Sequence, residues 1–357
     1  MSHTSSKASG SFACHCQGPK PCVTHDKMDE TSPLLGYRAD VGPAIPSPNL
    51  RPRHQELIPT PCGPIKSWSE LSGRLQFYFC FTIASLLVLL GLTIASINKQ
   101  LDTGISEEDN LAVSLIQLVG ILFCIYYIVR GILQDNRQEL LKFLLSVLVL
   151  MVRSVVNYCE LKPQGKTDLL ARFVSIMIFG VIHLVCSTLL IRTPGMMAFR
   201  VSGALKILQD QYFLLNRCFS LVTFDLQAQL SLCILLTTSD PSDRTKNHII
   251  LGVGVFWACL TAGVGAVGVL RESKLLVVVF MVQNLPQAAF FVYVMCEIVD
   301  KWHKDTADTL WAAAVTEATI SLVVKLVLIW SLVRLVKSFG QGLRERMSAP
   351  GRAPADG

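Results

Sequence analysis

Four ionisable residues lie inside long apolar stretches of the chain: Arg153, Asp225, Glu317 and Lys325. A charged side chain in the hydrocarbon core of a bilayer is unfavourable, so such residues pair with one another or line a water-filled path. Two of the four are basic and two are acidic, and their charges can therefore cancel inside the protein. A carboxylate in such a place can also bind and release a proton, which is the chemistry of proton-coupled transport.

The depths of these residues predict which of them pair. A helix rises about 1.5 Å per residue, which places Arg153 and Glu317 toward the same, non-cytosolic end of their apolar stretches. Asp225 and Lys325 fall near the centre or in the cytosolic half. We therefore predict the pairs Arg153–Glu317 and Asp225–Lys325. The sequence leaves open whether these charges line a polar pathway or form a fixed network that specifies helix packing.

A second group of polar residues surrounds a proline in the seventh apolar stretch, in the order Gln283-Asn284-Leu285-Pro286-Gln287. Proline cannot donate a backbone hydrogen bond, so a kink that frees a carbonyl group is expected at Pro286. Gln283 and Gln287 then share a face beside that break. Many transporters build substrate sites from polar groups beside broken helices. A tolerated kink with amide bonds between helices is the alternative.

The Pro286-Gln287 pair resembles the motif of the PQ-loop transporters, and this resemblance implies a transport function. That family repeats the motif at the start of two three-helix bundles. In this chain the motif occurs once, with a single apolar stretch after it. The resemblance covers only these few residues.

Composition indicates a protein with many membrane spans. Hydrophobic residues make up 51% of the chain and charged residues 16%, whereas a soluble domain carries about 25% charged residues. The net charge of +6 is explained by basic loops, so we expect the lipid bilayer and not nucleic acid as a partner. The 12 cysteines are scattered and mostly lie in apolar stretches, which argues against a secreted disulfide framework.

No sequence pattern indicates an enzyme. The segment Gly263–Gly268 matches the glycine pattern of dinucleotide-binding loops, but no strand precedes it and it lies in an apolar stretch. No HExxH, GxSxG or P-loop pattern occurs. We therefore expect no catalytic residues, no cofactor and no metal.

We predict an all-α fold, a bundle of about eight transmembrane helices over residues 71–335. Residues 1–70 are rich in Ser, Pro and Gly and are expected to form a disordered cytosolic tail, and residues 336–357 a short cytosolic tail. The third span is the weakest, because Arg153 and Asn157 interrupt it. The expected spans are Leu75–Ile97, Leu111–Val129, about 140–158, Phe173–Ile191, about 218–238, His248–Leu270, Leu275–Cys296 and Leu310–Val333.

Basic residues predict which loops face the cytosol. They are concentrated in alternate loops, and placing both termini in the cytosol puts each of these loops on that side. One of them, Arg192–Asn216, has apolar residues every three or four positions, which fits an amphipathic surface helix or an extension of the fifth span. The basic residues assigned to the cytosolic side are Arg130, Arg137, Lys142, Arg192, Arg200, Lys206, Arg217, Arg271, Lys274, Arg334, Lys337, Arg344 and Arg346.

The N-terminal tail contains a segment that resembles the acidic dileucine sorting signal, with Glu30 followed by Leu34 and Leu35. Clathrin adaptor complexes read such signals on the cytosolic tails of proteins bound for endosomes and lysosomes. We therefore expect an endosomal or lysosomal membrane, with the plasma membrane as the second choice. Three cysteines of the same tail fit either zinc binding or acylation: Cys14, Cys16 and Cys22.

The leading hypothesis is a membrane protein that moves a small solute or ion across an endosomal or lysosomal membrane with proton coupling. The alternative is a receptor-like or scaffold protein without transport, in which the buried charges are structural. The two differ in hydration, because a pathway requires Asp225 and Gln287 to face a common water-filled cavity. The candidate pathway residues are Arg153, Asp225, Gln229, Gln283, Asn284, Gln287, Glu317 and Lys325.

Overall fold

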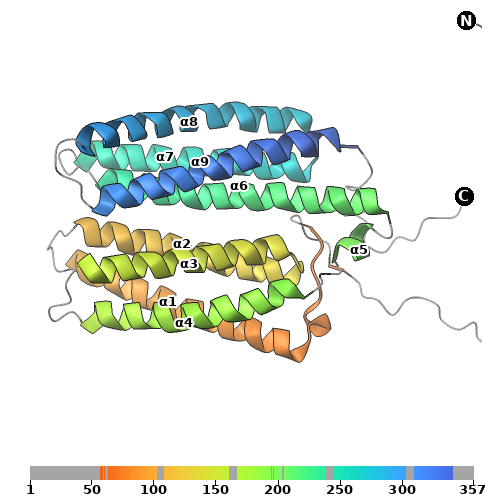
Figure 1. Ribbon diagram of the computed structural model, residues 1–357, viewed down its shortest axis with the longest axis horizontal. Helices are drawn as coiled ribbons and strands as arrows, with labels where there is room; N and C mark the ends of the chain where they lie inside the picture. The colour runs from red at the N-terminus through yellow and green to blue at the C-terminus, as the bar shows by residue number, and fades with distance from the viewer. Residues whose placement is uncertain are drawn as a thin grey trace, which may run out of the picture. The chain divides into compact units, whose positions relative to one another are not determined.

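The computed structural model describes residues 57–58, 60, 63–102, 108–160, 167–193, 195, 197–202, 205–238, 244–302 and 309–340. In these ranges the fold is all-α, as predicted (Figure 1). The sorting signal and the three cysteines of the tail lie outside the described residues. The long helices are α1 (Gly73–Asp102), α2 (Glu108–Leu133), α3 (Arg137–Glu160), α4 (Thr167–Arg192), α6 (Lys206–Thr238), α7 (Arg244–Leu270), α8 (Lys274–Trp302) and α9 (Thr309–Lys337).

Six of these helices are long and apolar enough to cross a membrane: α1, α2, α4, α6, α7 and α9. Helix α3, the weakest of the predicted spans, is not among them, and α8 contributes a shorter apolar segment, Lys274–Ala289. The six helices fit a multi-pass membrane protein. The count of eight spans and the cytosolic placement of the termini stay predictions.

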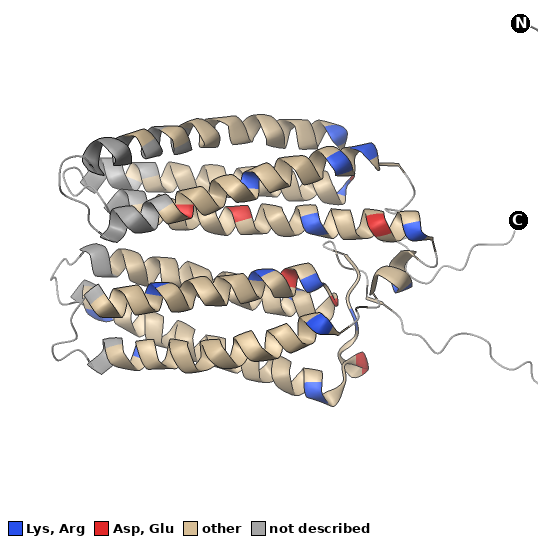
Figure 2. Ribbon diagram, viewed as in Figure 1, with Lys and Arg blue, Asp and Glu red and all other residues tan. Residues whose placement is uncertain are grey.

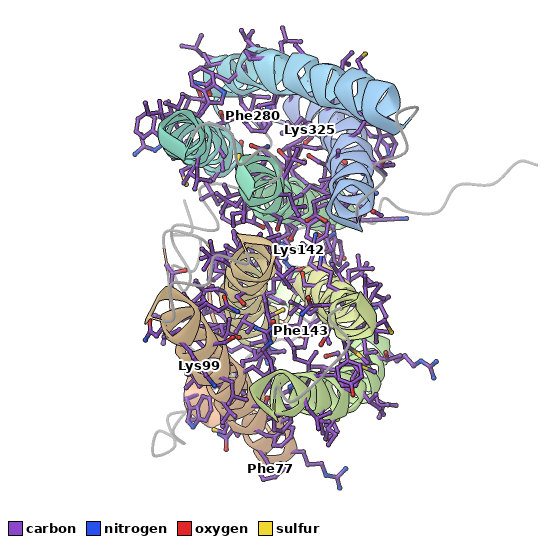
Figure 3. The ribbon with its side chains drawn as sticks, turned by 90° about the vertical axis from the view of Figure 1, so that its left-hand side faces the viewer. Phe77, Lys99, Lys142, Phe143, Phe280 and Lys325 are labelled. Carbon is purple, nitrogen blue, oxygen red and sulfur yellow. The ribbon has the colours of Figure 1, made fainter. Side chains whose placement is uncertain are left out.

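The long helices form two groups of four, which we name the first bundle (α1–α4) and the second bundle (α6–α9). Within each bundle every helix packs against the next in sequence, and the fourth helix closes the ring by packing against the first. Helix α6 also packs against α2 and α3 and so joins the two bundles. The charged residues of both bundles are marked in Figure 2. Figure 3 looks along the helices and shows both rings, with Lys142 between them and Phe143 and Lys325 inside.

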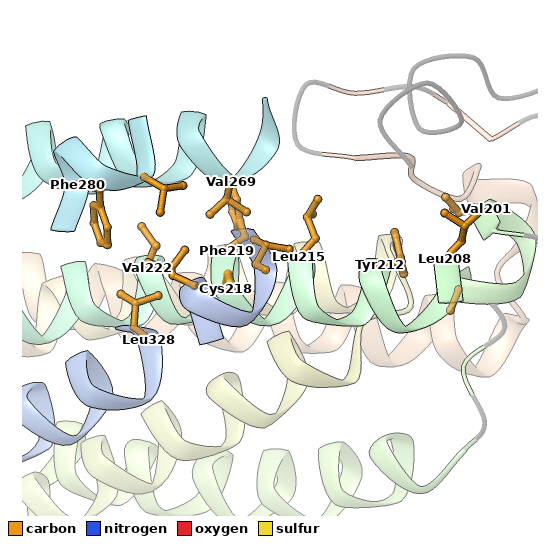
Figure 4. Packing of buried hydrophobic residues seen from close by; sticks show 14 of the residues in the cluster. Val201, Leu208, Tyr212, Leu215, Cys218, Phe219, Val222, Val269, Phe280 and Leu328 are labelled. Atoms are coloured by element: carbon orange, nitrogen blue, oxygen red, sulfur yellow. The ribbon is translucent and has the colours of Figure 1, made fainter. Parts of the chain in front are cut away.

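Each bundle has its own apolar core, and large apolar side chains also cover its outer surface. Because lipid tails are as apolar as leucine, close packing and polar contacts hold such helices together more than removal from water does. Phe77 and Leu275 are 75% and 74% exposed, as suits a lipid-facing surface. The core of the first bundle includes Leu86, Ile121, Tyr127, Phe143 and Met151, and that of the second includes Leu215, Phe219, Val269, Phe280 and Leu328 (Figure 4).

The turns between the second and third helices of the two bundles have the same geometry. We name Gly131–Asn136 and Gly268–Ser273 the repeated turns. Their acidic residues, Asp135 and Glu272, have positive φ angles of 49° and 50°. The last residue of each turn donates its backbone N–H to the carbonyl of the glycine that begins the turn. The N···O distances are 3.0 Å from Asn136 to Gly131 and 3.1 Å from Ser273 to Gly268, as in the helix-terminating Schellman motif.

The connection between the bundles decides between the two interpretations of Arg192–Asn216, an amphipathic surface helix and an extension of the fifth span. Helix α6 begins at Lys206 and continues to Thr238, and Tyr212 is 5% exposed. From Lys206 onward the segment is therefore an extension of the fifth apolar stretch and not a separate surface helix. The short helix α5 (Met197–Ser202) precedes it, and most of its residues are buried.

The last residues of the tail predicted to be disordered, residues 66–70, are packed against the helices. Lys66 donates its backbone N–H to Leu133 at 2.8 Å, and its ammonium lies 2.9 Å from Asp135 of the first repeated turn. The helix η1 (Trp68–Glu70) follows, and Glu70 pairs with Arg200 of α5 at 2.9 Å. Residues 66–70 therefore belong to the helical part of the chain.

Candidate functional site

Lys325 of α9 is the centre of a buried polar cluster in the second bundle. Its ammonium donates to three acceptors: Asp225 Oδ2 at 2.8 Å, Asn284 Oδ1 at 3.0 Å and Gln287 Oε1 at 2.8 Å. Asp225 belongs to α6, and the two amides belong to α8. The one lysine therefore connects three of the four helices of its bundle and uses its three protons to do so.

Two further side chains complete this cluster. Gln229 donates to Asp225 Oδ2 and accepts a hydrogen bond of 2.8 Å from Gln287 Nε2. The hydroxyl of Ser321 lies 3.4 Å from Asp225 Oδ1. Ser321 was missed in the sequence, although it lies one helical turn before Lys325 and so had to share its face.

Burial makes this charge pair important for the fold. Asp225 is 2% exposed and Lys325 is 8% exposed. An ion pair removed from water regains its desolvation cost only when its remaining hydrogen-bonding groups are satisfied. The amides of Asn284, Gln287 and Gln229 supply that satisfaction.

A cavity of about 540 Å³ opens beside the cluster and is lined by residues of α6, α7, α8 and α9. Most of its wall is apolar, with Trp257 of α7 as the largest side chain. Its polar lining consists of Gln229, Gln287, Ser321 and Lys325. Such a cavity, apolar with a few polar groups at one place, has the size and composition of a small-molecule site.

The proline of α8 does not interrupt the helix. Helix α8 continues from Lys274 to Trp302 through Pro286, so the proline does not end the helix, and the expected kink stays a prediction. Asn284 and Gln287 nevertheless reach the cluster. Gln283 does not join it, and its buried Oε1 has no hydrogen-bond partner among the described residues.

The second predicted ion pair is present as well, and it connects the two bundles. Arg153 Nη2 of α3 lies 2.6 Å from Glu317 Oε2 of α9. Glu317 precedes Lys325 by two helical turns, so this pair lies closer than the cluster to the helix ends at 160 and 309. Both predicted pairings are confirmed, while the predicted role of these residues in transport stays a prediction.

A third polar group lies between the bundles and was missed by sequence reasoning. Glu139 of α3 is fully buried and accepts a hydrogen bond of 2.7 Å from Ser220 of α6. Lys142 donates to Ser220 O at 3.0 Å and Thr223 Oγ1 at 2.8 Å. Arg130 lies 3.4 Å from Glu139.

The basic residues of this group had been assigned to a cytosolic loop. Arg130 and Lys142 are each 6% exposed and lie on helices α2 and α3. Their positions near helix ends made them resemble loop charges. The signal that could have corrected this is Glu139, three residues before Lys142 and so on the same helix face.

The fold and this site define a multi-pass helical protein of the membrane type, with two four-helix bundles and a buried ion-pair cluster. The chain belongs to the family described as Domain of unknown function (DUF7789), whose model matches residues 62–192 and 202–334. The first matched stretch contains the first bundle, and the second contains α6 to α8 and most of α9. Comparisons with curated proteins and with solved structures found no match.

Proposed function

We propose that the protein moves a small organic solute across a membrane and that the cavity of the second bundle binds this solute. The observation that carries the proposal is that Gln229, Gln287 and Lys325 belong both to the ion-pair cluster and to the wall of the cavity. A ligand there contacts the cluster directly. It can therefore change the contacts that hold α6, α8 and α9 together.

The lining suggests the kind of solute. An apolar wall favours an apolar body, and the two glutamine amides can each donate and accept a hydrogen bond. We propose a solute with an apolar body and one polar end group. Protonation of Asp225 would weaken its bond to Lys325, which is the step by which a proton gradient would be coupled to solute movement.

Transport can be tested in proteoliposomes with solid-supported-membrane electrophysiology. The probes are neutral amino acids, monocarboxylates and organic amines, each applied with and without a proton gradient. We expect a current from at least one class, abolished in Gln287→Leu. The matched control is Gln283→Leu, on the same helix but outside the cluster, which should keep the current. No current with any class would contradict the proposal.

The alternative, a receptor-like or scaffold protein, has its own support. The cluster satisfies its own hydrogen bonds, and Asp225 is almost fully buried and is not among the residues that line the cavity. On this proposal the charges only hold the bundle together. Neither the wild type nor Gln287→Leu would then give a current above that of empty liposomes, and Gln287→Leu would change only the stability of the protein.

The endosomal or lysosomal location is a further proposal, supported by the segment with Glu30, Leu34 and Leu35. A tagged chain is compared with its Leu34→Ala/Leu35→Ala variant by microscopy. We expect wild type in lysosomes and the variant at the cell surface, as adaptor binding through this signal requires. The same compartment for both would exclude the signal.

A further inference from the structure

The first bundle encloses a small cavity of about 20 Å³, lined by residues of α1, α2, α3 and α4. Its polar lining residues are Gln117 of α2 and His183 of α4, which are 8% and 2% exposed. The large cavity of the second bundle is likewise lined by all four of its helices. Each bundle therefore has a cavity that all four of its helices line.

The two cavities occupy corresponding positions in the sequence. When the repeated turns are aligned, Gln117 falls on Gly254 and Leu150 falls on Gln287. Gln117 and Leu150 line the small cavity, and Gly254 and Gln287 line the large one. At these two positions the bundles present corresponding residues to their cavities, whereas Ile121 and Val147 of the small cavity fall on Ala258 and Asn284, which do not line the large one.

The fourth helices correspond in the same way. The two stretches matched by the family model end at Arg192 and Arg334. Aligning α4 and α9 at these arginines places His183 on Lys325. His183 binds the first helix of its bundle through Ser85, as Lys325 binds the first helix of its own bundle through Asp225.

The hydrogen bonds of His183 are compatible with a proton on Nε2. The hydroxyl of Ser85 donates its one proton to Thr82 O at 2.9 Å, and it lies 2.8 Å from His183 Nε2. When the hydroxyl proton lies on Thr82 O, Ser85 accepts from Nε2, and the imidazole is then the tautomer that carries its proton on Nε2. In the neutral imidazole Nδ1 is then an acceptor, and it is buried without a hydrogen-bond partner among the described residues.

Gln117 supplies the complementary group. Its Nε2 is also buried and has no hydrogen-bond partner among the described residues. The small cavity is thus lined by one residue with an unused donor and one with an unused acceptor. Buried polar groups are nearly always paired, by protein or by water, and a cavity of this volume is large enough for one water molecule, which needs about 10–15 Å³.

We propose that the first bundle has a water-binding site at its centre, in which one water molecule accepts a hydrogen bond from Gln117 and donates one to His183 Nδ1. In the second bundle the long side chain of Lys325 reaches α6 and α8 directly. The shorter imidazole of His183 reaches only α1, and the water completes the connection to α2. This inference does not depend on the proposed transport.

The test fills the cavity. Val147 of α3 lines it and is 5% exposed, and Val147→Ile adds one methylene to the full-length protein in nanodiscs. If the cavity holds water, the larger side chain expels it and leaves Gln117 and His183 unpaired. We then expect the thermal unfolding midpoint to fall by about 2–4 °C. If the cavity is empty, the same change fills a void and raises the midpoint.

A second variant separates loss of water from simple overpacking. Gln117→Leu removes the donor. With water present, it should lower the midpoint of the wild type, because the water loses a partner. In the Val147→Ile background it should raise the midpoint, because it removes an unpaired buried donor. A higher midpoint for Val147→Ile, or no reversal of sign for Gln117→Leu, would overturn the proposal.

Discussion

Lys325 Nζ lies 2.8 Å from Asp225 Oδ2 and joins the last helix of the second bundle to its first. The same ammonium binds Asn284 and Gln287 of α8. These bonds connect α9 to α6 and α8. Gln287 and Lys325 also line the large cavity. Stability of the bundle and access to the cavity thus depend on the same side chains.

Loss of one partner of this pair should be worse than loss of both. Lys325→Leu leaves Asp225 as a buried charge without its cation, and we expect a loss of about 3–5 kcal/mol in the free energy of unfolding. Asp225→Leu/Lys325→Leu removes both charges and should recover much of that loss. Fluorescence-detected size exclusion and thermal unfolding in detergent measure it. A double variant no better than Lys325→Leu would contradict the structural pairing.

The ion pair between the bundles, Arg153–Glu317, should show the same coupling, with a smaller effect on stability. The side chain of Arg153 is 24% exposed, so solvent screens its interaction with Glu317 more than that of the buried cluster. Arg153→Leu should lower the unfolding midpoint more than Arg153→Leu/Glu317→Leu does. Strictly additive losses in the double variant would mean that the two residues do not pair.

Helix packing in the second bundle can be tested with two glycines of α7. A Cβ atom at Gly265 would lie 2.6 Å from the ring of Phe280 on α8, whereas a Cβ at Gly263 would have no atom within 4 Å. Gly265→Ala should therefore separate α7 from α8 and cost about 1–3 kcal/mol. Gly263→Ala is the matched control and should be neutral or slightly stabilising. Equal effects on the unfolding midpoint would contradict the α7–α8 contact.

The polar group between the bundles should depend on its carboxylate. Glu139→Gln leaves Lys142 and Arg130 buried without the negative charge that both approach. We expect a severe loss of monodisperse protein. Ser146→Ala, which removes one bond of 3.2 Å to Gln227 in the same interface, should cost only about 1 kcal/mol. Wild-type yield for Glu139→Gln would show that this group is not needed to join the bundles.

The sequence predicted the two long-range ion pairs because few charges occur in the apolar stretches and only certain depths match. Arg153 and Glu317 are far apart in the chain, but Arg153 lies near the C-terminal end of α3 and Glu317 near the N-terminal end of α9, which the predicted orientation places at similar depth. The same reasoning found Asp225 and Lys325. Gln287 was found because a proline precedes it. Helix α8 continues through Pro286, and the kink expected there stays a prediction.

Other features could not be predicted from the sequence. The division into two rings depends on how α6 packs against α2 and α3, and hydrophobic periodicity does not specify which helices become neighbours. Glu139 was overlooked because it lies near the start of α3, where a carboxylate is normally solvated. The volume of the large cavity depends on side chains from four helices, including Trp257, whose direction no local pattern gives.

The central proposal, that the cavity of the second bundle binds a transported solute, requires that water and solute can enter this cavity. Cys233 lines this cavity, and Cys218, on the same helix, is fully buried. In protein whose other cysteines are replaced by alanine, each thiol is exposed to a charged methanethiosulfonate reagent in nanodiscs, and labelling is measured by mass spectrometry. The proposed pathway predicts rapid labelling of Cys233 and none of Cys218. Protection of Cys233 equal to that of Cys218 would contradict a hydrated pathway and favour the scaffold.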